Sequence, residues 1–134
     1  MNSAVRDYRL FSLANISAVD LTEFSFPRRG DFSLAEFARR SFGVFQEAPI
    51  SVVLRFAPEA AEDAARWLFH PSQSMTCGKD GSITIRFRAG GMQEMCWHLF
   101  TWGTAVTVAA PKELRIRLAE LLARAAVHHS EAEI

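Results

Sequence analysis

Three arginines occupy alternate positions in two segments that have the pattern of β-strands. Apolar side chains alternate with Arg55 and its neighbours over residues 50–56, and with Arg86 and Arg88 over residues 83–88. Successive side chains of a strand point to opposite faces, so the three arginines should share the face that does not enter the core. A guanidinium group binds phosphate oxygens through parallel hydrogen bonds. The pattern therefore indicates a surface for an anionic ligand, unless the arginines only solvate this face or pair with acids.

The spacing of the cysteine and histidine residues does not match a catalytic or metal-binding motif. Both cysteines, Cys77 and Cys96, fall on the expected core faces of their elements, where a thiol acts as a small apolar group. No Cys-His or Ser-His pair has a diagnostic spacing. Cys96 and His98 lie two positions apart on a predicted helix and therefore diverge, and no C-x-x-C or H-E-x-x-H string occurs. We expect no enzyme, no metal site and no other cofactor.

Two further features could bind an anion but favour a simpler interpretation. Gly90 and Gly91 precede a predicted helix, whose first amides can hold an anion. The full glycine pattern of a phosphate loop is absent, so a strand-to-helix turn is favoured. Arg39 and Arg40 end a short predicted helix, where an interaction with the helix dipole is favoured over ligand binding.

The pattern of apolar residues predicts an α+β fold. A capping box at Ser33 and Glu36 predicts a helix over 34–40, and Asp80-Gly81 predicts a hairpin turn. Strands are predicted at 50–56, 73–77, 83–87 and 105–109, with helices after Pro58, over 92–100 and from Pro111 onward. The order βαββαβ is that of a ferredoxin-like sheet with helices on one face. A C-terminal helix follows, with an apolar stripe of Leu114, Leu118, Leu121, Leu122 and Ala125.

The ends of the chain give weaker patterns. Residues 8–16 alternate loosely and predict a strand, with residues 17–26 as a second extended piece, and residues 128–134 are expected to fray. Most of the eleven phenylalanines are expected in the core, because Phe has no polar group. Fifteen basic and fifteen acidic residues cancel, so the net charge gives no general nucleic-acid signal. The sequence opens without a signal-peptide pattern and has no membrane-spanning run, so we expect a cytoplasmic protein without membrane contact.

Several strings together resemble one protein family. They are R-D-Y-R-L-F at 6–11, V-V-L-R-F-A-P-E at 52–59, W-L-F-H-P-S-Q at 67–73, D-G-S-I-T-I-R-F at 80–87 and W-H-L-F-T-W-G-T-A-V-T-V-A-A-P-K-E-L-R at 97–115. The first is similar to the R-x-F-R-L-x-R-I run that closes WYL domains. The others resemble the C-terminal extension that follows the WYL domain in bacterial transcriptional regulators.

The resemblance implies a domain plan and candidate site residues. Residues 1–49 would be the last strand or two of a WYL (SH3-like) barrel with a helical linker, and residues 50–134 the ferredoxin-like extension. The chain would then be a fragment of a longer regulator or a short natural protein, without the helix-turn-helix that contacts duplex DNA. Arg6 and Arg9 fall on basic positions of the WYL ligand pocket, although Asn15 replaces a third. His70 and Gln73, in the H-P-S-Q string, are either ligand contacts or parts of a structural turn.

Together, the residues and the resemblance predict a ligand-sensing and dimerisation region of a WYL-type regulator. The expected ligand is single-stranded nucleic acid or a nucleotide-like anion, and the expected assembly is a homodimer. The alternative is a purely structural homodimerisation module that has no ligand of its own. A small ferredoxin-like enzyme is a third and more distant interpretation. The predicted ligand-binding residues are Arg6, Arg9, Arg55, His70, Gln73, Arg86 and Arg88.

Overall fold

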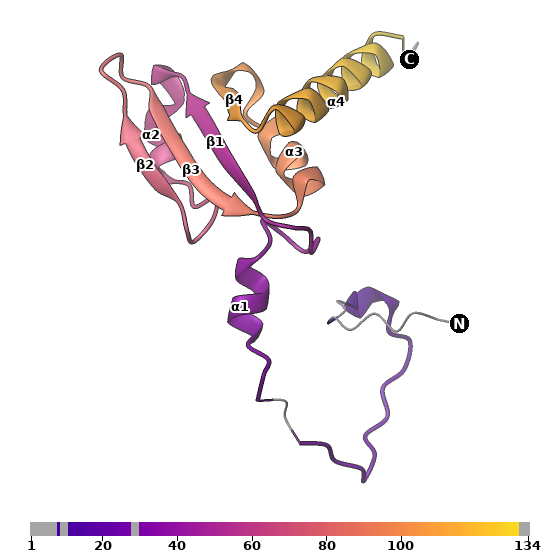
Figure 1. Cartoon of the computed structure of the whole chain (residues 1–134). Coiled ribbons are helices and arrows are strands. Elements are labelled where there is room, and N and C mark those ends of the chain that lie inside the picture. The colour runs from indigo at the N-terminus through magenta and orange to yellow at the C-terminus, as the bar shows by residue number, and fades with distance from the viewer. Residues whose placement is uncertain (1–7, 9–10, 28–29, 132–134) are drawn as a thin grey trace. The chain divides into compact units, whose positions relative to one another are not determined.

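The computed structural model describes Tyr8, residues 11–27 and residues 30–131 (Figure 1). It divides the chain into two compact units, Met1–Phe32 and Ser33–Ile134. The second unit contains the sheet and all four α-helices. The predicted site residues Arg6 and Arg9 lie outside the described residues.

The second unit is a mixed α+β fold built on an antiparallel sheet of four strands, in the order β2-β3-β1-β4. The predicted α+β class and the C-terminal helix are confirmed, and the two central strands β1 and β3 pair antiparallel. The strands are β1 (Ile50–Phe56), β2 (Ser74–Cys77), β3 (Ile83–Ala89) and β4 (Val106–Ala110). The helices are α1 (Leu34–Arg39), α2 (Ala61–Arg66), α3 (Met92–Phe100) and α4 (Lys112–Glu131).

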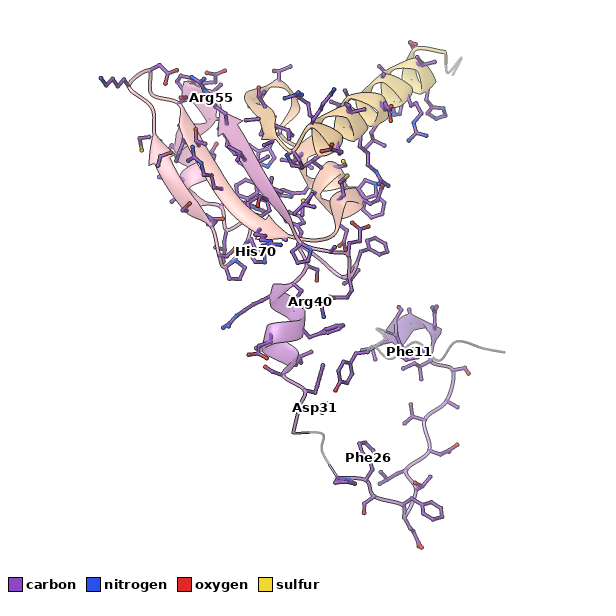
Figure 2. All side chains as sticks on the ribbon, in the orientation of Figure 1. Phe11, Phe26, Asp31, Arg40, Arg55 and His70 are labelled. Atoms are coloured by element: carbon purple, nitrogen blue, oxygen red, sulfur yellow. The ribbon has the colours of Figure 1, made fainter. Side chains whose placement is uncertain are left out.

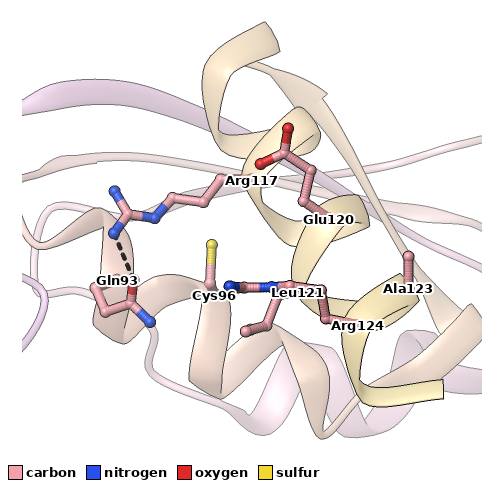
Figure 3. A pocket seen from close by; sticks show the side chains of 7 residues that line it. All are labelled: Gln93, Cys96, Arg117, Glu120, Leu121, Ala123 and Arg124. Carbon is pink, nitrogen blue, oxygen red and sulfur yellow. Dashed lines mark hydrogen bonds between the residues drawn. The ribbon is translucent and has the colours of Figure 1, made fainter. Parts of the chain in front are cut away.

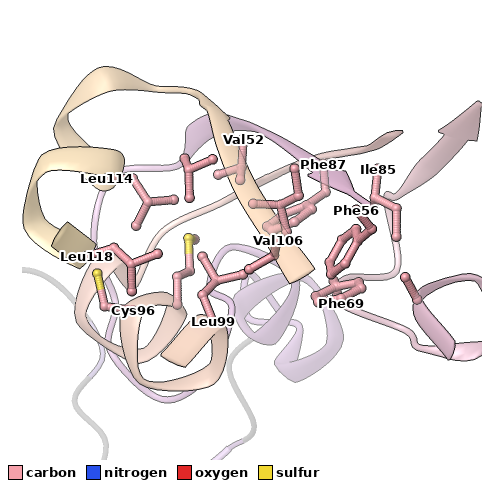
Figure 4. Close-up of a cluster of buried hydrophobic side chains, with 14 of the residues drawn as sticks. Val52, Phe56, Phe69, Ile85, Phe87, Cys96, Leu99, Val106, Leu114 and Leu118 are labelled. Carbon is pink, nitrogen blue, oxygen red and sulfur yellow. The ribbon is translucent and has the colours of Figure 1, made fainter. Parts of the chain in front are cut away.

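Alternating strand residues build the core on one face of the sheet (Figure 4). Leu54, Phe56 and Ile85 are fully buried, and the residues between them are exposed or half-buried. Burying a side chain of this size contributes about 1.5–3 kcal/mol, so the alternation fixes which face of each strand is inside. The helices complete the core with Ala64, Met95, Cys96, Leu99, Leu114 and Leu118.

A strap of residues 41–47 holds the end of α1 against the turn between β3 and α3. Ser41 and Gly90 form a parallel bridge, and the Gly90 N–H donates to the Arg40 carbonyl at 2.9 Å. A Cβ atom at Gly90 would lie 2.2 Å from the Glu47 carbonyl oxygen, so this close approach requires glycine. Gly91 has a φ of +91°, which a residue with a side chain rarely adopts. Ser33 caps α1 by accepting from the Glu36 amide at 3.3 Å, as the capping box predicts.

Helix α2 is shorter than the predicted apolar stripe. It ends at Arg66, and Ala65 and Leu68 are exposed, whereas Phe69 enters the core. The reason is a compact turn that begins at Trp67, which adopts an extended conformation. This turn shifts the inward-facing position by one residue. The ring of Phe69, rather than Leu68, therefore packs against the sheet.

The predicted strands of the N-terminal unit are wrong for the part of the chain that the structure describes. Leu13–Asn15 forms a short 3-10 turn, and no strand occurs among residues 11–27. A strand needs a partner to pair its backbone groups, and alternation alone does not supply one. The phenylalanine prediction is also wrong, because only Phe37, Phe56, Phe69 and Phe87 are buried in the described chain.

Two further predictions are corrected at the edges of the domain. Cys77 is exposed, because β2 is an edge strand whose four residues are all accessible. Residues 128–131 do not fray but continue α4 to Glu131. Among the described residues, no helix combines the length and the apolar character needed to cross a membrane.

Candidate anion-binding site

The exposed face of the sheet carries three arginines on its two central strands. Arg86 lies opposite Val53, and Arg88 lies opposite Ser51, whereas Arg55 lies opposite Thr84. All three arginines are exposed, so the side-chain directions predicted from the alternation are correct. We call the exposed surface around Arg55, Arg86 and Arg88 the open face.

The three arginines of the open face differ in how far their charge is compensated. Arg55 forms an ion pair with Asp80 at 2.5 Å. Arg86 donates to the Thr76 hydroxyl at 3.0 Å, and Arg88 donates to the Pro49 carbonyl at 3.4 Å, so both keep an uncompensated positive charge. The Ser82 hydroxyl and amide, assisted by Arg55, lower the pKa of Asp80, so this carboxylate stays ionised beside Arg55.

A pocket of about 520 Å³ gathers further positive charge at one end of the sheet. Figure 2 labels two of its lining residues, Arg40 and His70. Three of its lining residues are arginines from distant parts of the chain: Arg39 and Arg40 at the end of α1, and Arg88 on β3. The pocket therefore joins two elements that are separated by about one third of the sequence. Its remaining lining residues are Pro49, His70, Pro71 and Ser72.

His70 is buried at the wall of this pocket, and its hydrogen bonds define its protonation. The Ser72 amide donates to Nδ1 at 3.1 Å, so Nδ1 is an acceptor and Nε2 carries the proton. Nε2 then donates to the Arg39 carbonyl at 2.9 Å. The imidazole is neutral in this arrangement, and it ties the turn before β2 to the end of α1.

Gln73 organises the same turn but does not line the pocket. Its side-chain oxygen accepts from the amides of Phe69 at 2.7 Å and His70 at 3.3 Å. Its side-chain nitrogen donates to the Trp67 carbonyl at 3.1 Å. The side chain is committed to the backbone of the turn, which is the structural interpretation of the H-P-S-Q string.

The predicted site residues are only partly brought together. His70 and Arg88 meet in the pocket, whereas Arg55 and Arg86 lie on the open face. Sequence reasoning missed Arg39 and Arg40 as pocket residues, since it assigned them to the helix dipole. No local pattern pairs them with His70, which is 31 positions from Arg39. The adjacent arginines at the end of a helix are the one sequence signal that could have found them.

The glycine turn before α3 already holds an anion from the chain itself. The Glu47 carboxylate accepts from the amides of Gly91 at 3.2 Å and Met92 at 2.9 Å. In return, the Glu94 carboxylate accepts from the amides of Val44 and Phe45 at 2.9 and 3.0 Å. These amides are therefore occupied by carboxylates, which explains the turn without an external ligand.

A second pocket of about 460 Å³ lies between α3 and α4, where Cys96 is fully buried (Figure 3). Burial raises the pKa of the Cys96 thiol, and the positive charge of Arg117 lowers it by a smaller amount. The protonated thiol is a poor nucleophile and a poor metal ligand. Arg117 itself donates to the Gln93 side chain. Among the described residues, no group of three His, Cys, Asp or Glu side chains is placed to hold a metal ion.

His98 belongs to an aromatic cluster behind the sheet. Its ring stacks on Trp67 with centroids 5.2 Å apart, and its Nε2 accepts from the Trp102 indole N–H at 3.3 Å. Burial lowers the pKa of His98, so the ring is neutral at pH 7. The cluster supports the core and leaves the arginines as the groups available to an anion.

A comparison with known protein families gives one match. The family model of the WCX domain matches residues 48–126, which is more than half of the chain. The chain therefore belongs to the WCX domain family, a domain found in WYL-family regulators. No curated protein matches the chain. The match runs from just before β1 into the second half of α4, and it includes His70 and Arg88 but not Arg39 and Arg40.

Proposed function

We propose that this chain is the ligand-sensing and dimerisation region of a WYL-type transcriptional regulator. The WCX match supports a regulatory role of this general kind. The proposed ligand is a single-stranded nucleic acid or a nucleotide-like anion. The observation that carries the proposal is the open face, where Arg86 and Arg88 are exposed on the central strand β3 and have no acidic partner within the described chain.

The fold supports a binding role for that face. The strand order β2-β3-β1-β4, with α2 after β1 and α3 after β3, fits a ferredoxin-like description, which we adopt as part of the proposal. In such a sheet, the helices cover one face and leave the other available. Ligand binding on that face would favour one arrangement of the full-length regulator over another, which is a population shift.

Binding of short oligonucleotides at two salt concentrations tests this function. We expect fluorescent oligothymidylate to bind the full chain, with an affinity that falls as salt rises, because each phosphate contact releases counterions. Arg86→Gln should weaken binding several-fold and reduce the salt dependence by about one phosphate contact. The matched control is Arg66→Gln, which removes another exposed arginine, paired with Glu62 on α2.

The outcomes separate the two candidate functions. Loss of binding in Arg86→Gln but not in Arg66→Gln supports the sensor. A stable dimer that binds no oligonucleotide at either salt concentration favours the structural dimerisation module. Helix α4 favours a dimer in both cases, because a second apolar stripe of Ile116, Ala119, Ala123 and Val127 recurs at helical spacing on a face other than the buried one.

A further inference from the structure

The pocket beside α1 is assembled from two parts of the chain that are distant in the sequence. Arg39, Arg40 and Pro49 belong to α1 and the segment before β1, whereas Arg88 belongs to β3. The turn at 70–72 closes the pocket between them. A ligand in this pocket would touch both parts at once.

The guanidinium groups that line the pocket have no carboxylate partner among the described residues. Among the described residues, Arg39 and Arg40 have neither an ion pair nor a side-chain hydrogen bond. Arg88 makes a single long side-chain bond of 3.4 Å to a carbonyl. By contrast, Arg55 and Arg66 are paired with carboxylates. Three like charges around one pocket repel each other, and an anion between them removes that repulsion.

The lining also selects a chemical class of anion. Planar guanidinium groups bind the oxygens of a phosphate bidentately, and three of them can satisfy a terminal phosphate that carries two charges. The remaining lining residues add Pro49, Pro71, the neutral His70 and the Ser72 hydroxyl, which together carry no negative charge. The pocket volume of about 520 Å³ accepts a phosphate with an attached group.

We propose that this pocket binds a phosphomonoester and that its occupancy holds the end of α1 on the sheet. The proposal rests on the proposed function only where the phosphate belongs to a nucleotide or an oligonucleotide, and it extends that function by a second site distinct from Arg86. His70 already ties the Arg39 carbonyl to the turn, and Gly90 ties the Arg40 carbonyl to β3. A phosphate between Arg88 and the two α1 arginines adds a third tie between the same elements.

The first experiment measures ligand binding to the full chain by calorimetry. The probes are inorganic phosphate, adenosine 5′-monophosphate, adenosine, and a short oligothymidylate with and without a 5′-phosphate. We expect the monophosphate to bind and adenosine not to bind, and the 5′-phosphorylated oligonucleotide to bind at least five-fold more tightly than the 5′-hydroxyl form. If inorganic phosphate binds as tightly as the monophosphate, the ligand of the pocket is free phosphate rather than a phosphomonoester.

The second experiment uses trypsin, which cleaves after arginine, to measure whether a bound ligand holds the end of α1 on the sheet. Cleavage after Arg39 and Arg40 should slow at least three-fold with saturating monophosphate, whereas cleavage after Arg124 on α4 should not change.

Two variants test the pocket in the binding experiment. Arg40→Gln should abolish the preference for the 5′-phosphate, and Arg66→Gln should keep it. Circular dichroism of each variant verifies that the fold is intact.

The outcomes separate this inference from the proposed function. If both oligonucleotides bind equally and only Arg86→Gln weakens them, the sensor stands and the phosphomonoester pocket is wrong. If the monophosphate binds in an Arg40-dependent way and no oligonucleotide binds, the pocket stands and nucleic-acid sensing is wrong. Monophosphate binding without slower cleavage after Arg39 and Arg40 overturns the tie to α1. Binding of no probe overturns both proposals.

Discussion

At the scale of single residues, the structure places His70 and His98 in two different hydrogen-bonded environments. His70 is buried with both ring nitrogens bonded, so its proton position is fixed by the Ser72 amide and the Arg39 carbonyl. His98 is held by Trp67 and Trp102 and accepts a hydrogen bond at Nε2. Each ring acts as a neutral structural group, and the positive charge near the pocket comes from arginine.

The lowered pKa of His98 predicts a pH dependence of stability. Burial lowers this pKa below its ordinary value of 6.5 in the folded chain, so the unfolded chain binds more protons as the pH falls below about 6.5. The free energy of unfolding should therefore be constant above that pH and decrease as the pH falls from about 6.5 to 5. Urea unfolding at a series of pH values measures this decrease.

A pair of variants isolates the contribution of His98. His98→Phe keeps an aromatic ring and removes the titration, so it should flatten the pH dependence below 6.5 while losing about 1 kcal/mol of stability with the Trp102 bond. His129→Gln, at an exposed position of α4, should leave the pH dependence as in the original chain. An equal slope in His98→Phe and the original chain would contradict the assignment.

At the scale of elements, the strap of residues 41–47 fixes how α1 leaves the sheet domain. Glu47 and Glu94 exchange carboxylate-to-amide bonds between the strap and the start of α3. Such bonds satisfy amides at a helix start that would otherwise lack partners. The strap therefore fixes the end of α1, which carries Arg39 and Arg40, to the turn after β3.

Gly90→Ala should loosen this strap. The added Cβ would lie 2.2 Å from the Glu47 carbonyl oxygen, so the backbone of the strap must move. Overpacking of this kind costs about 1–3 kcal/mol, which urea unfolding can measure. Gly30→Ala is the control, because nothing lies within 4 Å of its Cβ position, and it should change stability by less than about 0.5 kcal/mol. Equal stability of the two variants would show that the strap is not tightly seated.

The strands and helices of the sheet domain were predictable, and the pocket was not. Alternation in β1 and β3 predicts which side chains are buried, because strand geometry repeats every two residues and needs no distant information. The end of α2 was not predictable, because the bonds from Gln73 that form the next turn come from beyond the helix. The pocket depends on Arg39 meeting His70, a contact set by the strap rather than by local pattern.

At the scale of the whole molecule, the pocket beside α1 and the open face share one residue. Arg88 lies on the open face beside Arg86 and also lines the pocket with Arg40. A ligand that spans both surfaces would place its terminal phosphate in the pocket and its backbone along β3. This arrangement would allow a chain with no net charge to bind an anion.

Assembly belongs to the same scale, and we propose α4 as the surface of the homodimer. Leu114 and Leu118 are buried against the domain, whereas Ile116 is 45% exposed and Val127 is 53% exposed. Ile116 and Val127 lie eleven positions apart and therefore on the same side of the helix. Two copies of this stripe can pack against each other about a two-fold axis, as closed homodimers do. We therefore expect the chain to dimerise through α4.

Ile116→Glu tests this interface by placing two like charges across the axis. The variant should raise the dissociation constant of the dimer at least ten-fold in sedimentation velocity, because an unpaired charge is buried with its symmetry mate. Thr104→Glu, in the exposed turn before β4, adds the same charge outside the stripe and should leave the dimer intact. If the dimer is equally stable in both variants, the interface does not lie on α4. If the chain is monomeric at all concentrations, the proposed homodimer is wrong.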